Sequence, residues 1–109
     1  MRRLRIGING FGRIGRSVFR IIHQQGLFDV VAINDINPDP VNIAYLLRYD
    51  SMRGIFPGVV SVGERGLSVN GHEVSLHHCV NILDVPWAEH GVDVLIDASG
   101  VRENGVALA

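Results

Sequence analysis

The sequence predicts an α/β fold built on a doubly wound, mainly parallel sheet, and three observations support this prediction. First, a Gly-x-Gly-x-x-Gly motif at residues 10–15 lies between an alternating apolar segment, residues 4–9, and an amphipathic segment, residues 14–22. Second, residues 30–33 form a near-continuous apolar run, as a parallel strand covered on both faces requires. Third, another apolar strand is expected at residues 92–97. A strand, a helix and a strand in close succession indicate a right-handed βαβ unit.

The first expected helix follows the glycine motif directly. Its apolar stripe has the i, i+4, i+7, i+8 spacing of one helical face and comprises Ile14, Val18, Ile21 and Ile22. The face predicted to meet water comprises Arg16, Arg20, His23 and Gln24. Gly26 is expected to end the helix as a left-handed cap residue.

Each glycine of the motif has a separate expected role. Gly10 allows the tight turn from strand to helix, and Gly12 lets a pyrophosphate approach the backbone where a Cβ would collide. Gly15 lets the helix lie close to the sheet. The phosphates would then meet free N–H groups near Arg13 and Ile14, where the helix dipole favours an anion. The alternative is a glycine-rich turn that binds no ligand.

Asp35 stands at the end of the second expected strand, twenty residues after Gly15. A carboxylate at this position accepts hydrogen bonds from a ribose diol and repels a 2′-phosphate, so it favours NAD over NADP. The alternative is an acid that caps a turn, because residues 34–40 are rich in turn formers.

The turn at residues 98–100 should face the same ligand, because ligands of open α/β sheets lie outside the carboxyl ends of the strands. The sequence thus indicates a Rossmann-type fold. The predicted cofactor-binding residues are Gly10, Phe11, Gly12, Arg13, Ile14, Gly15, Asn34, Asp35, Ser99 and Gly100.

The middle of the chain predicts a second helix and a small antiparallel insertion. Asp39 and Pro40 form a favourable helix start, and the segment Tyr49-Asp50-Ser51 ends that helix. A short strand is expected at residues 59–62, and Asn70-Gly71 predicts a hairpin turn. Further along, residues 86–90 form a helical turn with Trp87 as a core anchor, and residues 101–109 resemble the start of a helix.

The composition excludes several classes of protein. The chain has 109 residues, 47% of them hydrophobic and 19% charged, and a net charge of −1, so residues 1–109 are expected to form one domain without affinity for nucleic acid. No apolar run is long enough for a membrane span. One cysteine, Cys79, favours a reducing compartment, with cytoplasm as the default. The cluster His77-His78-Cys79 is interpreted as structural, because consecutive strand residues alternate in direction, and no metal site is expected.

The residues described so far resemble the amino terminus of glyceraldehyde-3-phosphate dehydrogenase. The matching segments are 7–16, 33–35, 45–51, 69–71, 91–93 and 98–100, in family order. The resemblance implies the NAD-binding domain of a cytoplasmic, usually homotetrameric glycolytic oxidoreductase. By that resemblance, the backbone at Arg13 and Ile14 holds the pyrophosphate and Asp35 holds the adenosine ribose. Asp50 and Ser51 would lie near a neighbouring subunit.

Two positions depart from the family pattern. An arginine that contacts the adenine end of NAD in the family corresponds to Val80, and the family's Ser-Thr-Gly becomes Ala98-Ser99-Gly100. The family's nucleophilic Ser-Cys-Thr-Thr-Asn stretch is not found in these residues, and Cys79 does not replace it. We therefore expect a truncated NAD-binding domain without a catalytic domain or catalytic residues, which is inactive alone and prone to self-association through its uncovered sheet.

Two alternatives remain open at this point. Erythrose-4-phosphate dehydrogenases share the amino-terminal pattern, and the residues that separate the two substrates lie elsewhere. A non-catalytic NAD-binding or sensing module would also carry a complete nucleotide loop without catalytic residues.

Overall fold

The computed structural model describes residues 3–100, and these form a six-stranded sheet with helices on its faces. The helices are α1 (Arg13–Gln25) and α2 (Pro40–Arg48), with the short 3-10 turns η1 (Ile82–Asp84) and η2 (Ala88–His90). The large sheet contains β1 (Leu4–Asn9), β2 (Phe28–Asn34), β5 (Val60–Val62), β6 (Gly66–Val69), β7 (His72–His77) and β8 (Val94–Asp97). A separate two-stranded sheet pairs β3 (Tyr49–Asp50) with β4 (Gly54–Ile55). The helix start expected at residues 101–109 lies outside the described residues.

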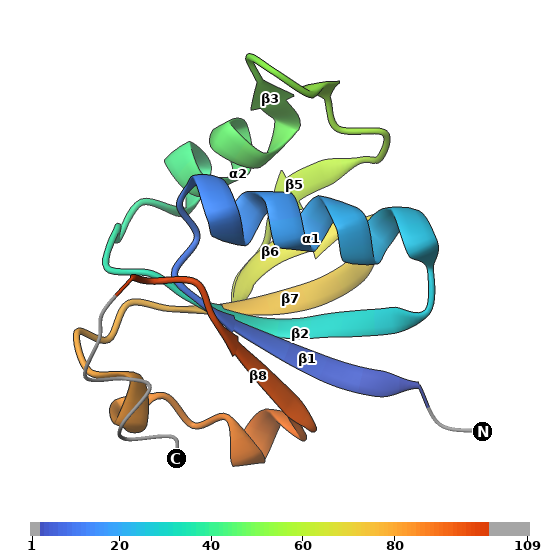
Figure 1. Cartoon of the computed structure of the whole chain (residues 1–109). Coiled ribbons are helices and arrows are strands. Elements are labelled where there is room, and N and C mark those ends of the chain that lie inside the picture. The colour runs from blue at the N-terminus through green and yellow to red at the C-terminus, as the bar shows by residue number, and fades with distance from the viewer. Residues whose placement is uncertain (1–2, 101–109) are drawn as a thin grey trace.

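The strand order β5-β6-β7-β2-β1-β8 confirms the predicted fold class. Strands β7, β2, β1 and β8 are parallel, whereas β5 and β6 are antiparallel and form one edge. Figure 1 shows α1 and α2 above the sheet and the segment with η1 and η2 below it. Between β7 and β8 the chain passes below the sheet to the other side of β1. The direction in which successive strands are added to the sheet therefore reverses next to β1. A crevice at such a reversal is where ligands of open α/β sheets bind.

Local sequence features explain how several elements begin and end. The Asp39 side chain accepts hydrogen bonds from Val41 N and Asn42 N and caps α2, while Pro40 occupies the first turn. Gly26 ends α1 in the left-handed conformation, and its N–H donates to Ile22 O. Asn70 and Gly71 both have positive φ, as a two-residue hairpin turn requires. These predictions are confirmed.

The predicted orientation of α1 is wrong in part. Ile14 is 67% exposed and Ile21 45% exposed, whereas Phe19 and Arg20 are buried. A Cβ on Gly15 would collide with the carbonyl oxygen of Gly10, so the glycine loop presses this side of the helix against the sheet. The buried face therefore runs through Gly15, Phe19 and Ile22 rather than through Ile14 and Ile21.

Arg20 serves as an internal support for α2 rather than as a surface residue. Its Nη2 donates to the carbonyl oxygens of Leu47 at 2.7 Å and Gly54 at 3.0 Å, and its guanidinium lies 5.5 Å from the Phe56 ring centroid. The guanidinium thus bonds the Leu47 carbonyl group, which the end of α2 leaves without an intrahelical partner, and the Gly54 carbonyl group of β4.

An Arg20→Met chain should therefore unfold more easily, by about 2 kcal/mol, because it leaves buried carbonyl oxygens without a donor. Urea denaturation measures the change. Arg65→Met, at an exposed position, is the matched control and should change stability by less than about 0.5 kcal/mol. Equal stability of the two variants would contradict the supporting role of Arg20.

One side of α1 borders an apolar groove of about 320 Å³. It is lined by Leu4, Ile6, Val18, Ile21, Ile22, Phe28, Val94 and Ile96. The exposed apolar surface expected along the strand at residues 92–96 is therefore present at Val94, which is 42% exposed. Within residues 3–100 no helix is long and apolar enough to cross a membrane.

Candidate functional site

The carboxyl ends of four parallel strands form one polar edge. The last residues of these strands are paired in register: Asp97 with Asn9, Asn9 with Asn34, and Asn34 with His77. Strands β1, β2 and β8 are mostly apolar, β7 is mixed, and each of the four ends in a polar side chain. This edge adjoins the glycine loop, which leaves β1 at Gly10 and enters α1 at Arg13.

The glycine loop is held tightly at two of its glycines and is open at the third. Gly10 has a φ of 91°, and a Cβ there would lie 2.7 Å from Ser99 Cα, so the segment after β8 packs directly against this residue. Gly15 meets the Gly10 carbonyl oxygen in the same way. By contrast, a Cβ on Gly12 would have no described atom within 4 Å beyond its chain neighbours. The tight turn predicted at Gly10 and the close approach predicted at Gly15 are both present.

The first turn of α1 begins at this open position. Gly12 is the N-cap residue, and neither a capping side chain nor an acidic residue satisfies the first turn. Arg13 and Ile14 are exposed there, whereas Phe11 is buried and its ring packs edge-on against Phe19 with centroids 5.8 Å apart. Phe11 thus offers only its backbone to the site. An uncapped helix N-terminus over an open glycine has the properties of an anion-binding position.

The carboxylate of Asp35 lies against the glycine loop. Its Oδ1 accepts a hydrogen bond from Phe11 N at 2.9 Å, and its Oδ2 accepts one from Asn37 N at 3.0 Å. The turn-capping alternative is therefore present in the structure. Because an ionised carboxylate has about four acceptor positions, these two bonds leave room for the hydroxyl groups of a ribose.

Asn34 is buried, and its side chain is used inside the protein. Its Nδ2 donates to Asn9 Oδ1 at 2.8 Å and to Cys79 O at 3.0 Å, and its Oδ1 accepts from Cys79 N at 2.8 Å. These bonds join β1, β2 and the segment after β7. The structure therefore gives Asn34 a role in holding the site together.

Ser99 and Gly100 complete the edge on the β8 side. Ser99 Oγ donates to Asp97 Oδ1 at 2.7 Å, and Asn9 Nδ2 donates to the same carboxylate oxygen at 3.0 Å. Gly100 has a φ of 76° and no described atom within 4 Å of a hypothetical Cβ. One hydrogen-bonded chain thus runs from Ser99 through Asp97, Asn9 and Asn34 to Cys79.

Two residues that link the predicted ones to one another, Asn9 and Asp97, were not predicted from the sequence. The sequence pattern places both in strands and gives neither a role in the site. A signal was available, because a polar residue at the carboxyl end of an apolar parallel strand lies at the ligand-binding edge of the sheet.

Val80, at the position where the family has an arginine that contacts adenine, is exposed to solvent. Val80 is 93% exposed, and it directly follows Cys79, whose backbone is bonded to Asn34.

Asp50, predicted near a subunit contact, caps its own turn: hydrogen bonds from Met52 N and Arg53 N lower the pKa of its carboxyl group. No group of three or more potential metal ligands occurs within residues 3–100.

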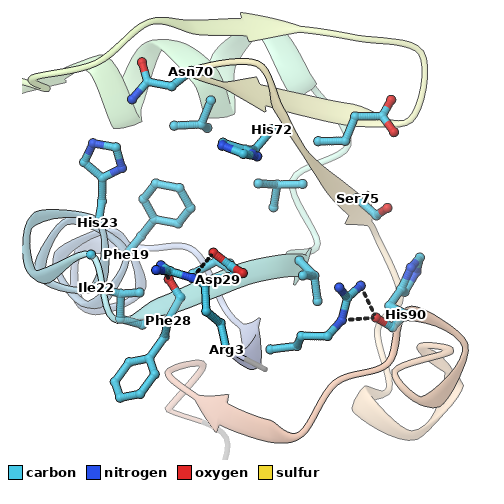
Figure 2. Close-up of a pocket in the computed structure, with 17 residues that line it drawn as sticks. Arg3, Phe19, Ile22, His23, Phe28, Asp29, Asn70, His72, Ser75 and His90 are labelled. Carbon is cyan, nitrogen blue, oxygen red and sulfur yellow. Dashed lines mark hydrogen bonds and ion pairs between the residues drawn. The ribbon is translucent and has the colours of Figure 1, made fainter. Parts of the chain in front are cut away.

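A hollow larger than the apolar groove lies away from this edge. Its volume is about 530 Å³, and it is situated where the amino-terminal parts of β2 and β7 separate. Figure 2 shows the Arg3–Asp29 ion pair, 2.9 Å long, at this hollow, together with His72, Ser75 and His90. None of the predicted cofactor-binding residues lines it.

A parallel sheet with a reversed strand order, a glycine loop that opens onto an uncapped helix and an acid at the end of the second strand define a dinucleotide-binding domain of the Rossmann type. The geometry at Gly12 and Asp35 fits a pyrophosphate and a ribose, respectively.

Comparison with known proteins identifies the family. The family model for the NAD binding domain of glyceraldehyde 3-phosphate dehydrogenase matches residues 4–105. Among curated relatives, the glyceraldehyde-3-phosphate dehydrogenases of Ajellomyces capsulatus and Borreliella burgdorferi are 43% and 42% identical over 98 residues, which is 90% of this chain and 29% of each relative. That of Emericella nidulans is 41% identical over 97 residues, 89% of this chain and 29% of the relative.

The chain belongs to the family of glyceraldehyde-3-phosphate dehydrogenase NAD-binding domains, whose cofactor is NAD. It spans about 29% of the length of the relatives that it matches.

Proposed function

We propose that this chain binds NAD at the polar edge of the sheet and forms the cofactor-binding part of a phosphorylating glyceraldehyde-3-phosphate dehydrogenase. The observation that supports this most is the open backbone at Gly12, at the uncapped start of α1 and next to the Asp35 carboxylate. The names of the relatives favour a triose phosphate over a tetrose phosphate as the substrate of the whole protein.

The binding roles divide between backbone and side chains. The amides of Arg13 and Ile14 receive the pyrophosphate, where the helix dipole adds a favourable field. The remaining acceptor positions of Asp35 bind the adenosine ribose, and Ser99 and Gly100 flank the crevice from β8. NAD supplies the hydride acceptor when it is bound.

None of the covalent chemistry on the aldehyde is assigned to residues 1–109. Cys79 is the only cysteine, and its backbone is bonded on both sides to the Asn34 amide, which indicates a structural position. We therefore expect the purified chain to bind NAD without oxidising glyceraldehyde 3-phosphate. An NADH absorbance assay measures this, and turnover by the chain alone would contradict the assignment.

We further propose that the whole protein is a cytoplasmic homotetramer in which Asp50 and Ser51 lie near a subunit contact. The apolar groove beside α1 supports association of the chain, because Leu4, Ile21 and Val94 are each more than 40% exposed. Analytical ultracentrifugation measures the assembly state, and a strictly monomeric chain at high concentration would contradict self-association.

Calorimetric titration of the whole 109-residue chain with NAD tests the binding proposal directly. Saturable binding with one site per chain is expected. Absence of binding by a chain with a cooperative unfolding transition would refute it.

An Asp35→Ala chain should bind NAD about 1–3 kcal/mol more weakly, the usual value of hydrogen bonds to a charged group. Its relative tolerance of NADP should rise, because the negative charge that repels a 2′-phosphate is gone. Parallel titrations with NAD and NADP measure both effects. Asp29→Ala, which removes a surface carboxylate paired with Arg3, is the matched control and should bind NAD normally.

A further inference from the structure

Two histidines lie in direct contact beside the polar edge. His77 is the last residue of β7 and His90 is the last residue of η2. Their Nε2 atoms are 2.8 Å apart, and their ring centroids are 5.0 Å apart, so the rings extend in opposite directions from a shared hydrogen bond. One nitrogen must donate a proton and the other must accept it, so this bond requires at least one neutral ring.

The main chain of His77 and the ring of the next residue hold Asp35 in place. The Asp35 N–H donates to the carbonyl oxygen of His77 at 3.0 Å. His78 Nδ1 lies 3.1 Å from the carbonyl oxygen of Asp35, within hydrogen-bond distance. The Asp35 carboxylate then reaches the glycine loop through Phe11 N. The backbone N–H of Asp35 is thus bonded to His77, and its carbonyl oxygen contacts the ring of the adjacent His78.

The charges around the pair oppose a second proton. Burial lowers the pKa of His77, and the positive charges of protonated His90 and His78 lower it further, while Glu89 acts in the opposite direction. From β1, the Arg5 guanidinium donates to the carbonyl oxygen of His90 at 2.8 Å and 3.2 Å and adds another positive charge beside η2.

Near Arg5, the Asp93 carboxylate accepts a hydrogen bond from the backbone N–H of Arg5. The dashed lines at His90 in Figure 2 mark the two hydrogen bonds that its carbonyl oxygen accepts. Among the neighbours named here, Glu89, Asp93 and Asp35 are acidic, and Arg5, His78 and His90 are basic.

We propose that the His77–His90 hydrogen bond positions the Asp35 segment for NAD, and that double protonation of this pair weakens NAD binding in mildly acidic solution. This inference rests on the proposed function. Two imidazolium rings have no acceptor nitrogen between them, so the hydrogen bond is replaced by repulsion between like charges. The end of β7 then moves away from η2 and takes the backbone partner of Asp35 with it.

The direction of the pH effect follows from the lowered pKa of His77. The folded chain favours neutral His77, so the unfolded chain binds more protons in the range between the lowered pKa and about 6.5. The contribution of neutral His77 to stability is present above that range and is lost as the pH falls through it. NAD affinity should follow the same course, since NAD selects the ordered Asp35 segment.

The test is a pH series of NAD titrations on three forms of the whole 109-residue chain: the natural sequence, His90→Gln and His72→Gln. Between about pH 8 and pH 5.5, the natural chain should lose about tenfold in affinity. The side-chain amide oxygen that His90→Gln introduces still accepts a hydrogen bond from protonated His77, so this variant should lose less than about threefold over this range. His72→Gln alters an exposed histidine at the other end of β7 and should follow the natural chain.

Equal pH profiles for the natural chain and His90→Gln would overturn the inference. A second measurement is independent of NAD: in the free chain, the amide resonance of Asp35 should shift with the titration of the His77 ring, and this shift should shrink in His90→Gln. An Asp35 amide that does not respond to this titration would also overturn it. Failure of NAD to bind at pH 8 would instead refute the proposed function, and the amide measurement would still decide the role of the histidine pair.

Discussion

A Gly12→Val chain is expected to keep its fold and to lose NAD binding by at least about 100-fold. A Cβ at this position meets no described protein atom within 4 Å beyond its chain neighbours, so the substitution does not strain the fold through packing. The added side chain occupies the volume that the pyrophosphate needs to reach the amides of α1. Loss of two hydrogen bonds to a charged phosphate, at about 1.5–3 kcal/mol each, accounts for the expected loss of affinity.

The stability of this variant should fall by about 1 kcal/mol, because valine is a poorer N-cap residue than glycine. Gly63→Val is the matched control, since Gly63 is also exposed and a Cβ there has its nearest contact at 3.9 Å. It should bind NAD with unchanged affinity. Calorimetry gives the affinity and urea denaturation gives the stability. Normal NAD binding by a folded Gly12→Val chain would show that the pyrophosphate binds elsewhere.

An Asn34→Ala chain is expected to lose about 3 kcal/mol of folding free energy, a large fraction of the total for a domain of this size. The substitution removes three hydrogen bonds at once and leaves Asn9 Oδ1 and both backbone groups of Cys79 without this partner. Leaving a buried polar group unsatisfied costs about 1–3 kcal/mol, which is more than the loss of an exposed hydrogen bond.

Asn81→Ala provides the control for this prediction. Its side chain caps the exposed turn η1 through Leu83 N, so its replacement should cost no more than about 1 kcal/mol. Urea denaturation followed by the fluorescence of Trp87 compares the two variants. A loss below about 1 kcal/mol in Asn34→Ala would mean that the hydrogen-bonded chain along the polar edge contributes little to stability.

The Gly12→Val and Asn34→Ala variants test two different properties of the site, ligand binding and stability of the fold. Gly12 lies where the protein leaves space, so its replacement acts on the ligand. Asn34 lies where the protein bonds to itself, so its replacement acts on the fold, and any effect on NAD follows from displacement of the Asp35 segment.

Much of the architecture could be predicted from residues close together in the chain. The glycine motif, the apolar run before Asn34 and the Asn70-Gly71 turn each depend on local backbone conformation or on the period of a strand. The caps of both helices, at Asp39 and Gly26, are local in the same sense. The small pairing of β3 with β4 was missed, because residues 53–58 carry no alternating pattern and are typical of a loop.

The rotation of α1 and the role of Arg20 could not be predicted in this way. Periodicity predicts that Ile14 and Ile21 lie inside, but the close approach of Gly15 to Gly10 decides which face meets the sheet. Arg20 is buried because the end of α2 and the start of β4 bring carbonyl groups to it, and these residues are more than twenty-five positions away in the chain.

The amino-acid sequence by itself determined the class of fold, the position of the glycine loop and the acid beside it, because turns, caps and strand periods are set by neighbouring residues. Only the tertiary structure decided that Asn9, Asn34 and Asp97 form one hydrogen-bonded chain and that His77 meets His90. These contacts depend on the register between parallel strands and on a chain crossing beneath the sheet. Long-range register of this kind is fixed by packing of the whole domain, which no local pattern records.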